Sequence, residues 1–293
     1  MNECESNVPP PLPVVVPPVI PPPPRVWPVF VLYVVTIVAI LVFSVVVVVV
    51  VALAKYGIPC NPAKVQRVMT SVPGLLGSVV STMIAVAGGA LAGAWLSRVP
   101  WRERLRLRAI NLAPVNLVVG SLGVLGIGLV VQGLNGLEWI PRSPVLETLD
   151  RFVKSLSAGG LVATVVVIGV LPGIAEELMF RGYVQTRLSE RWGPRWGIFV
   201  SALMFGVLHF DLVQGSFAVA MGVFLGFLTE RSRTIVPAMI CHAVNNTVAT
   251  LSSAWGLDFT SRSANGLALV GGLAVASGAV FYFCREKREW VTA

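Results

Sequence analysis

Long uncharged runs of apolar residues recur along the chain, and most are close to the length that crosses a lipid bilayer. Because the bilayer core has no water to hydrogen-bond the backbone, such runs must be helices. The pattern predicts eight spans, at residues 26–54, 71–97, 113–135, 156–180, 197–210, 214–229, 234–254 and 264–283. We therefore expect an all-α fold, a polytopic membrane helical bundle of about eight transmembrane helices.

The fifth and sixth runs are shorter than the others. The fifth has 14 residues, and at about 1.5 Å per residue it covers only ~21 Å, against ~30 Å of hydrocarbon. We expect both to sit in a thinned bilayer or to be partly enclosed by neighbours. Gly89 and Gly93, like Gly222 and Gly226, are four residues apart within spans, a spacing that lets helices approach closely.

Composition supports a membrane protein. Of the 293 residues, 55% are hydrophobic and 12% are charged, whereas soluble domains carry about 25% charged residues. The net charge of +8 does not indicate nucleic-acid binding, because the basic residues lie mostly in short loops between spans. The cysteines share no metal-type spacing; they are Cys4, Cys60, Cys241 and Cys284.

The distribution of basic residues predicts the orientation. With eight spans and the N-terminus inside, the inner segments hold 14 Lys and Arg and the outer loops hold seven, with Arg181 left out. Inner loops at about 98–108 and 187–195 account for most of this excess. The positive-inside rule then places both termini in the cytoplasm. We expect an integral multi-pass protein of the cell membrane.

Four regions are expected along the chain. Residues 1–25 form a proline-rich tail, extended or disordered, and residues 26–150 form N-terminal membrane helices. The first apolar run is nearly twice as long as a signal-peptide core of about 7–15 residues, so we interpret it as an anchor that stays. Residues 151–255 form the core that carries the polar side chains, and residues 256–293 form the last helix and a basic tail.

The stretch LPGIAEELMFRG places Glu176, Glu177 and Arg181 at the end of an uncharged run. A charged group in a membrane helix costs about 2.5–3.5 kcal/mol on insertion scales, so such groups usually face an interior cavity. Glu177 and Arg181 are i, i+4 neighbours and can form an ion pair. Glu176 lies about 100° around the helix, so its carboxylate is free for chemistry.

Both histidines of the chain, His209 and His242, fall within apolar spans. Helical spacing puts Phe205 on the face of His209, and Asn246 on the face of His242. Because these polar faces must all avoid lipid, we expect them to converge with the two acids on one cavity.

This set of side chains suits hydrolysis by water. A Glu and a His together can act as a general base, and a second His with an Asn amide can donate hydrogen bonds to a developing oxyanion. No G-x-S-x-G motif is present, and Cys241 points about 100° away from His242. Water is then the nucleophile, and an amide is the natural bond to hydrolyse.

The ordered motifs resemble one family. EELMFR fits E-E-x-x-x-R, FGVLH fits F-x-x-x-H and HAVNN fits H-x-x-x-N, on successive predicted helices. This chain is similar to the CPBP intramembrane proteases, over about residues 150–250. That group includes CAAX prenyl endopeptidases of the Ras-converting type and bacteriocin-processing or self-immunity proteins.

The resemblance implies a role for each motif residue. Glu176 and His209 would activate the attacking water, and His242 with Asn246 would stabilise the tetrahedral intermediate. Glu177 and Arg181 would hold the glutamate helix in position, and Phe205 belongs to the same motif as His209.

Metal dependence has two readings. Family members have also been described as metalloproteases, so a zinc ion held by Glu176, His209 and His242 is the alternative. Because H-E-x-x-H is absent from the chain, we favour a site without metal or other cofactor.

Two other functions compete with proteolysis. A proton- or cation-coupled transporter could use intramembrane acids and histidines, but no inverted repeat is visible. A non-catalytic scaffold or immunity protein of the same fold would need none of the four candidate catalytic residues, which are Glu176, His209, His242 and Asn246. The expected partners are a membrane-associated peptide or protein, prenylated or a precursor peptide, and the lipid bilayer; the oligomeric state is left open.

Overall fold

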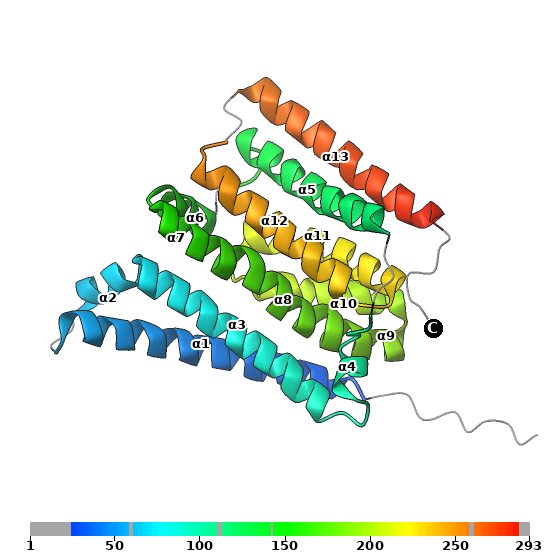
Figure 1. The fold of residues 1–293 in the computed structure, drawn as a ribbon, viewed down its shortest axis with the longest axis horizontal. Helices are drawn as coiled ribbons and strands as arrows, with labels where there is room; N and C mark the ends of the chain where they lie inside the picture. Colours follow the sequence, from blue (N-terminus) through cyan, green and yellow to red (C-terminus); the bar gives the residue numbers. More distant parts are fainter. Residues whose placement is uncertain (1–24, 59–60, 110–112, 142, 258–260, 287–293) are drawn as a thin grey trace, which may run out of the picture.

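The structure is a computed structural model that describes residues 25–58, 61–109, 113–141, 143–257 and 261–286. These residues are helical wherever they are regular, and no strand occurs among them (Figure 1). The predicted proline-rich tail lies outside the described residues, except for Arg25. The helices are α1 (Trp27–Tyr56), α2 (Pro62–Met69), α3 (Val72–Trp95), α4 (Trp101–Arg104), α5 (Pro114–Gly136), α6 (Pro144–Lys154), α7 (Ala158–Thr164), η1 (Val165–Val170), α8 (Leu171–Glu177), η2 (Leu178–Gln185), α9 (Thr186–Trp192), α10 (Pro194–Val207), α11 (Leu212–Ser232), α12 (Val236–Ala254) and α13 (Arg262–Arg285).

The all-α membrane bundle is confirmed, and each predicted span coincides with a helix. Six helices are long and apolar enough to cross a membrane: α1, α3, α5, the continuous helix Ala158–Trp192, α11 and α13. The prediction that the sixth run is short is wrong, since α11 has 21 residues. The predicted run began at Gln214 and ended before Glu230, but the helix starts two residues earlier, where Asp211 caps it, and continues through the ion-paired Glu230.

The helices form a layered bundle. The α1–α3 hairpin lies along one side, the α5–α13 pair lies along the other, and the helices from α7 to α12 fill the space between them (Figure 1). Both small-residue pairs sit at helix contacts. A Cβ on Gly89 would collide with Thr36 of α1, and one on Gly226 would lie 2.7 Å from Gln185 Oε1.

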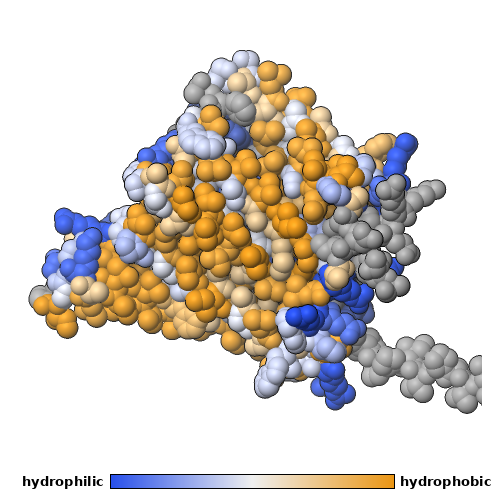
Figure 2. Space-filling model, in the orientation of Figure 1, coloured by the Kyte–Doolittle hydropathy of each residue, from blue (hydrophilic) through white to orange (hydrophobic). Residues whose placement is uncertain are grey.

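The arginine-rich segments gather at one end of the bundle. The start of α1 meets the end of α9 through Phe30 and Trp192, whose rings are 6.2 Å apart. Arg104 pairs with Glu190 at 2.8 Å. Between the ends, a broad apolar band covers the visible face (Figure 2). The predicted inner loops therefore share one end, as an inside surface requires.

Candidate functional site

The glutamates lie on a helix of 35 residues, Ala158–Trp192, which contains two π-helical stretches. The stretch η1 ends just before Pro172, whose ring nitrogen cannot donate to the i−4 carbonyl, and this favours a local widening of the helix. The stretch η2 begins directly after Glu177. A π-helical turn has more residues per turn than an α-helix, so it rotates the side chains that follow it around the helix axis. The α-helical segment α8, which carries Glu176 and Glu177, lies between two such stretches.

Glu177 is fully buried and holds two partners. Its Oε1 accepts a hydrogen bond from Arg181 Nη1 at 2.8 Å, the ion pair expected from the i, i+4 spacing. The same oxygen lies 2.8 Å from His242 Nδ1 on α12. Because an ionised carboxylate only accepts, Nδ1 carries the hydrogen, and Glu177 joins the long helix to α12.

Glu176 is 7% exposed and keeps a looser environment. Its Oε2 lies 3.6 Å from His242 Nε2, beyond a good hydrogen bond. In the described part of the chain, His242 is the titratable side chain that faces the Glu176 carboxylate. His242 thus sits between the two acids, bonded to one and facing the other.

His209 occupies a place that the sequence did not predict. It was expected within a helix, but α10 ends at Val207 and His209 lies in the following turn. The turn closes because Phe210 takes a positive φ of 51° and Asp211 caps the next helix. His209 still packs on Phe205, with ring centroids 5.0 Å apart, and its Nδ1 donates to the Phe205 carbonyl at 3.0 Å.

Phe205 connects the histidines to the buried ion pair. Its ring centroid lies 5.8 Å from that of His242, and the Arg181 guanidinium lies 4.6 Å from the same ring. The ring is completely buried. Phe205 therefore forms an apolar wall between His209 and the cluster of Glu177, Arg181 and His242.

Asn246 lies one helical turn after His242 and is half-buried. Its Oδ1 accepts a hydrogen bond from Asn245 Nδ2 at 3.2 Å. That bond fixes the orientation of the amide, so Nδ2 of Asn246 is the group left to donate. The structure thus places Asn246 on the same helix face as His242.

Two further polar features escaped sequence reasoning. Asp211 accepts from the Gln214 N–H at 2.7 Å and from the Ser143 hydroxyl at 2.9 Å. The Gln214 hydrogen bond in particular lowers the pKa of the Asp211 carboxyl, two residues from His209. An acidic residue directly before an apolar helix is a capping signal, so this residue could have been found.

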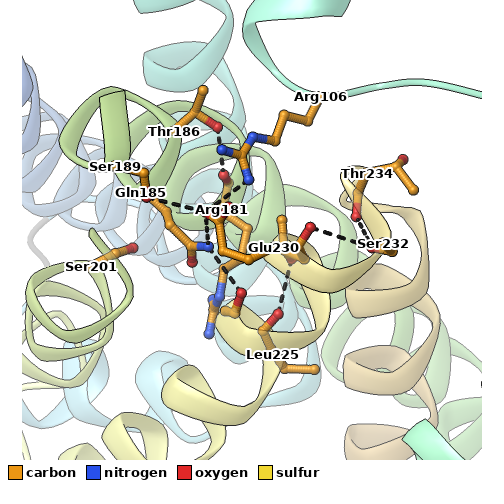
Figure 3. A network of polar contacts seen from close by, with 12 residues as sticks. Arg106, Arg181, Gln185, Thr186, Ser189, Ser201, Leu225, Glu230, Ser232 and Thr234 are labelled. Carbon is orange, nitrogen blue, oxygen red and sulfur yellow. Dashed lines mark hydrogen bonds and ion pairs between the residues drawn. The ribbon is translucent and has the colours of Figure 1, made fainter. Parts of the chain in front are cut away.

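The second feature is a network at the end of η2 (Figure 3). Glu230 of α11 accepts from Gln185 at 2.9 Å and from Ser189 at 3.1 Å, and it pairs with Arg106 at 2.8 Å. The partners come from distant parts of the sequence, so no local pattern predicts them. The network fixes the helix that carries Glu176 against α11.

The alternative zinc set is not assembled as a metal site. Within the described ranges, no three His, Cys, Asp or Glu side chains form a group that could hold a metal ion. His242 Nδ1 is bonded to Glu177 and His209 Nδ1 to a backbone carbonyl, so Nε2 is the ring nitrogen that each histidine has left for a ligand.

Ionisable residues at membrane depth mark functional sites, and this multi-pass helical protein brings Glu, His and Arg together there. Its class is that of membrane proteins with a polar centre enclosed by helices. Residues 158–248 match the family model described as type II CAAX prenyl endopeptidase Rce1-like. The match supports the CPBP and CAAX protease family that the motifs resemble. A comparison with curated proteins gave no match.

Proposed function

We propose that the protein is an intramembrane endopeptidase that hydrolyses a peptide bond of a membrane-associated substrate. The observation that carries this proposal is the difference between the contacts of Glu177 and those of Glu176. Glu177 is held by Arg181 and His242 at 2.8 Å each, whereas Glu176 faces the 3.6 Å gap to His242 Nε2. One acid is fixed, and the other is free to take a proton.

The proposed reaction gives Glu176 and His209 the roles that the resemblance implies. Glu176, aided by His209, removes a proton from water as the water oxygen bonds to the scissile carbonyl carbon. General-base catalysis of this kind contributes about 10²–10⁴-fold. The proton then passes to the leaving amine as the C–N bond breaks. Because His209 donates Nδ1–H to a carbonyl, its neutral ring keeps a lone pair on Nε2 for this proton transfer.

The oxyanion of the intermediate would be stabilised by His242 and Asn246. The Glu177 carboxylate orients the His242 ring, and in its protonated form this ring donates from Nε2. The Asn246 amide is turned so that its nitrogen donates. Donors fixed in advance cost no reorganisation when the charge develops.

The substrate is a peptide or protein at the membrane. The matched family is described by its CAAX prenyl endopeptidases, which favours a prenylated C-terminal peptide over a precursor peptide. Neither hydrolysis step needs a metal in this scheme. We therefore expect activity of the purified protein to survive a strong chelator; loss in chelator that added zinc restores would contradict the metal-free mechanism.

The test compares Glu176→Gln with Glu177→Gln. Membrane-associated peptides are compared by proteomics in cells with the wild-type protein and with each variant, and a farnesylated CAAX-type peptide is a purified probe. Glu176→Gln should abolish cleavage while the protein accumulates normally, because it removes the base and little packing. Full activity of Glu176→Gln would reverse the assignment of the two acids.

We also propose that the protein lies in the cell membrane with both termini in the cytoplasm. The shared end of the arginine-rich segments supports this orientation. Reporter fusions after residue 105 and after residue 145 should report opposite sides, the first of them cytoplasmic. The same side for both would contradict the eight-span topology.

A further inference from the structure

A polar pocket lies at the arginine-rich end of the bundle, and neither Glu176 nor Glu177 lines it. It has a volume of about 210 Å³ and lies between the loop after α3 and the helix α9. The residues that line it are Val99, Glu103, Arg104, Arg106, Arg108, Thr186 and Glu190. None of them belongs to the proposed catalytic site.

The pocket carries an excess of positive charge, with three arginines against two glutamates. Arg104 is 4% exposed and gives Nη1 to both oxygens of Glu190, at 2.8 and 2.9 Å. Its Nε is buried without a hydrogen-bond partner. A buried donor without an acceptor is costly, so an anion that reached it would be stabilised.

The other two arginines differ in how they are held. Arg106 is fixed by its pair with Glu230 at 2.8 Å. Arg108 is exposed, and no carboxylate of the described residues pairs with its guanidinium. The pocket thus combines two anchored guanidinium groups with one free to close on a ligand.

We propose that this pocket binds the phosphate group of an anionic membrane phospholipid. Guanidinium groups match phosphate geometry through paired hydrogen bonds, and basic pockets at the cytoplasmic ends of helices suit lipid headgroups. Exposed apolar side chains that suit acyl chains stand close in sequence to the lining residue Val99: Trp95 is 80% exposed, Leu96 74% and Trp101 45%. Exposed tryptophans are typical of the membrane interface.

A lipid fits this place better than the end of a peptide substrate. Thr186 is the pocket residue nearest in sequence to Glu176, and it lies ten residues further along the same helix. The eight residues of η2 lie between them, and no residue that lines the pocket is one of the proposed catalytic residues. The pocket is therefore a separate site.

The test uses the purified full chain in nanodiscs that contain phosphatidylcholine and phosphatidylglycerol. Native mass spectrometry counts the phosphatidylglycerol that stays bound after release from the disc. The wild type should retain phosphatidylglycerol over phosphatidylcholine, and Arg108→Gln should lower its affinity about fivefold, the share of one interfacial arginine. Arg98→Gln removes an exposed arginine of the same loop outside the pocket and should retain the lipid.

Three results would overturn the proposal. Equal retention of the two lipids would show that the pocket selects no anionic headgroup. An equal loss in Arg98→Gln and Arg108→Gln would assign binding to diffuse charge. Displacement of the lipid by millimolar inorganic phosphate alone would make the ligand a free anion. Arg108 is exposed, so its variant should fold, and thermal stability in detergent checks this.

Discussion

The α1–α3 hairpin and the helices around Glu176 are both apolar membrane segments, but they bury different groups. In the most apolar 18-residue stretch of α1, which has a mean hydropathy of 3.5, only 11% of the stretch is buried. In α11, which packs beside the glutamate helix, 44% is buried at a mean hydropathy of 1.8. The more apolar helix is thus the more exposed one, because in lipid the outer surface must be apolar.

The contacts inside the two regions differ accordingly. Gly93 of α3 lets Leu32 of α1 and Tyr183 of η2 approach its backbone. The glutamate region is held by polar pairs, such as Glu177 with Arg181 and the Ser201 hydroxyl with the Phe180 carbonyl at 2.7 Å. Van der Waals packing of small residues drives the first kind of association. The second kind depends on hydrogen bonds and ion pairs between buried polar groups.

The largest effect is expected from removing Arg181. In Arg181→Ala the fully buried Glu177 keeps its charge with only His242 to balance it, and the Phe205 ring loses the cation packed on it. Breaking a buried pair costs about 3–5 kcal/mol. Denaturation in sodium dodecyl sulfate should show this loss in the free energy of unfolding.

Thr36→Val is the matched change in the hairpin. The Thr36 hydroxyl is buried, with no hydrogen-bond partner among the described residues. Replacing such a group by a methyl of similar shape should change the free energy of unfolding by less than about 1 kcal/mol. Equal losses in the two variants would mean that the regions are not held by different forces.

The next effect is on turnover. Asn246→Ala should lower kcat about 10²–10³-fold, the usual cost of losing one oxyanion donor, and Asn246→Asp should be at least as damaging because it places an acceptor there. Asn245→Ala removes only the bond that orients the amide, at 3.2 Å, and should cost about fivefold. The assay uses the substrate that the proteomic comparison of the wild type with Glu176→Gln identifies. Equal losses for Asn245→Ala and Asn246→Ala would remove Asn246 from the oxyanion site.

The sequence predicts the local part of this architecture well. The order of the spans follows from hydropathy alone, and the pair of Glu177 and Arg181 follows from helical spacing. Both depend on residues close together in the chain. The glycine pairs could be placed at helix contacts for the same reason, although not their partners.

The parts that could not be predicted depend on long-range contacts. The bond from His242 to Glu177 joins residues 65 apart in sequence, and the end of α10 before His209 depends on a backbone turn at Phe210. Glu230 looked like the end of an apolar run, yet Arg106 neutralises it within the bundle. An ionisable residue can lie within a membrane helix when an oppositely charged side chain pairs with it. The fold determines whether such a partner is present, so the sequence pattern alone does not show where the helix ends.

The smallest effect tests the packing of the hairpin itself. A Cβ at Gly93 would lie 2.6 Å from Leu32 Cδ2 and 2.7 Å from the Tyr183 ring. The leucine can rotate, but the buried tyrosine ring must move, so Gly93→Ala should cost about 1–3 kcal/mol in the free energy of unfolding.

Gly88→Ala is the control on the same helix, because its Cβ would meet nothing within 4 Å. It should be neutral or slightly stabilising, since alanine favours a helix over glycine by up to about 1 kcal/mol. Unfolding in sodium dodecyl sulfate compares the two. Since Tyr183 lies on η2, six residues after Glu177, Gly93→Ala should also lower cleavage, while Gly88→Ala should not. A loss of stability with unchanged cleavage would show that the hairpin supports the fold without positioning the glutamate helix.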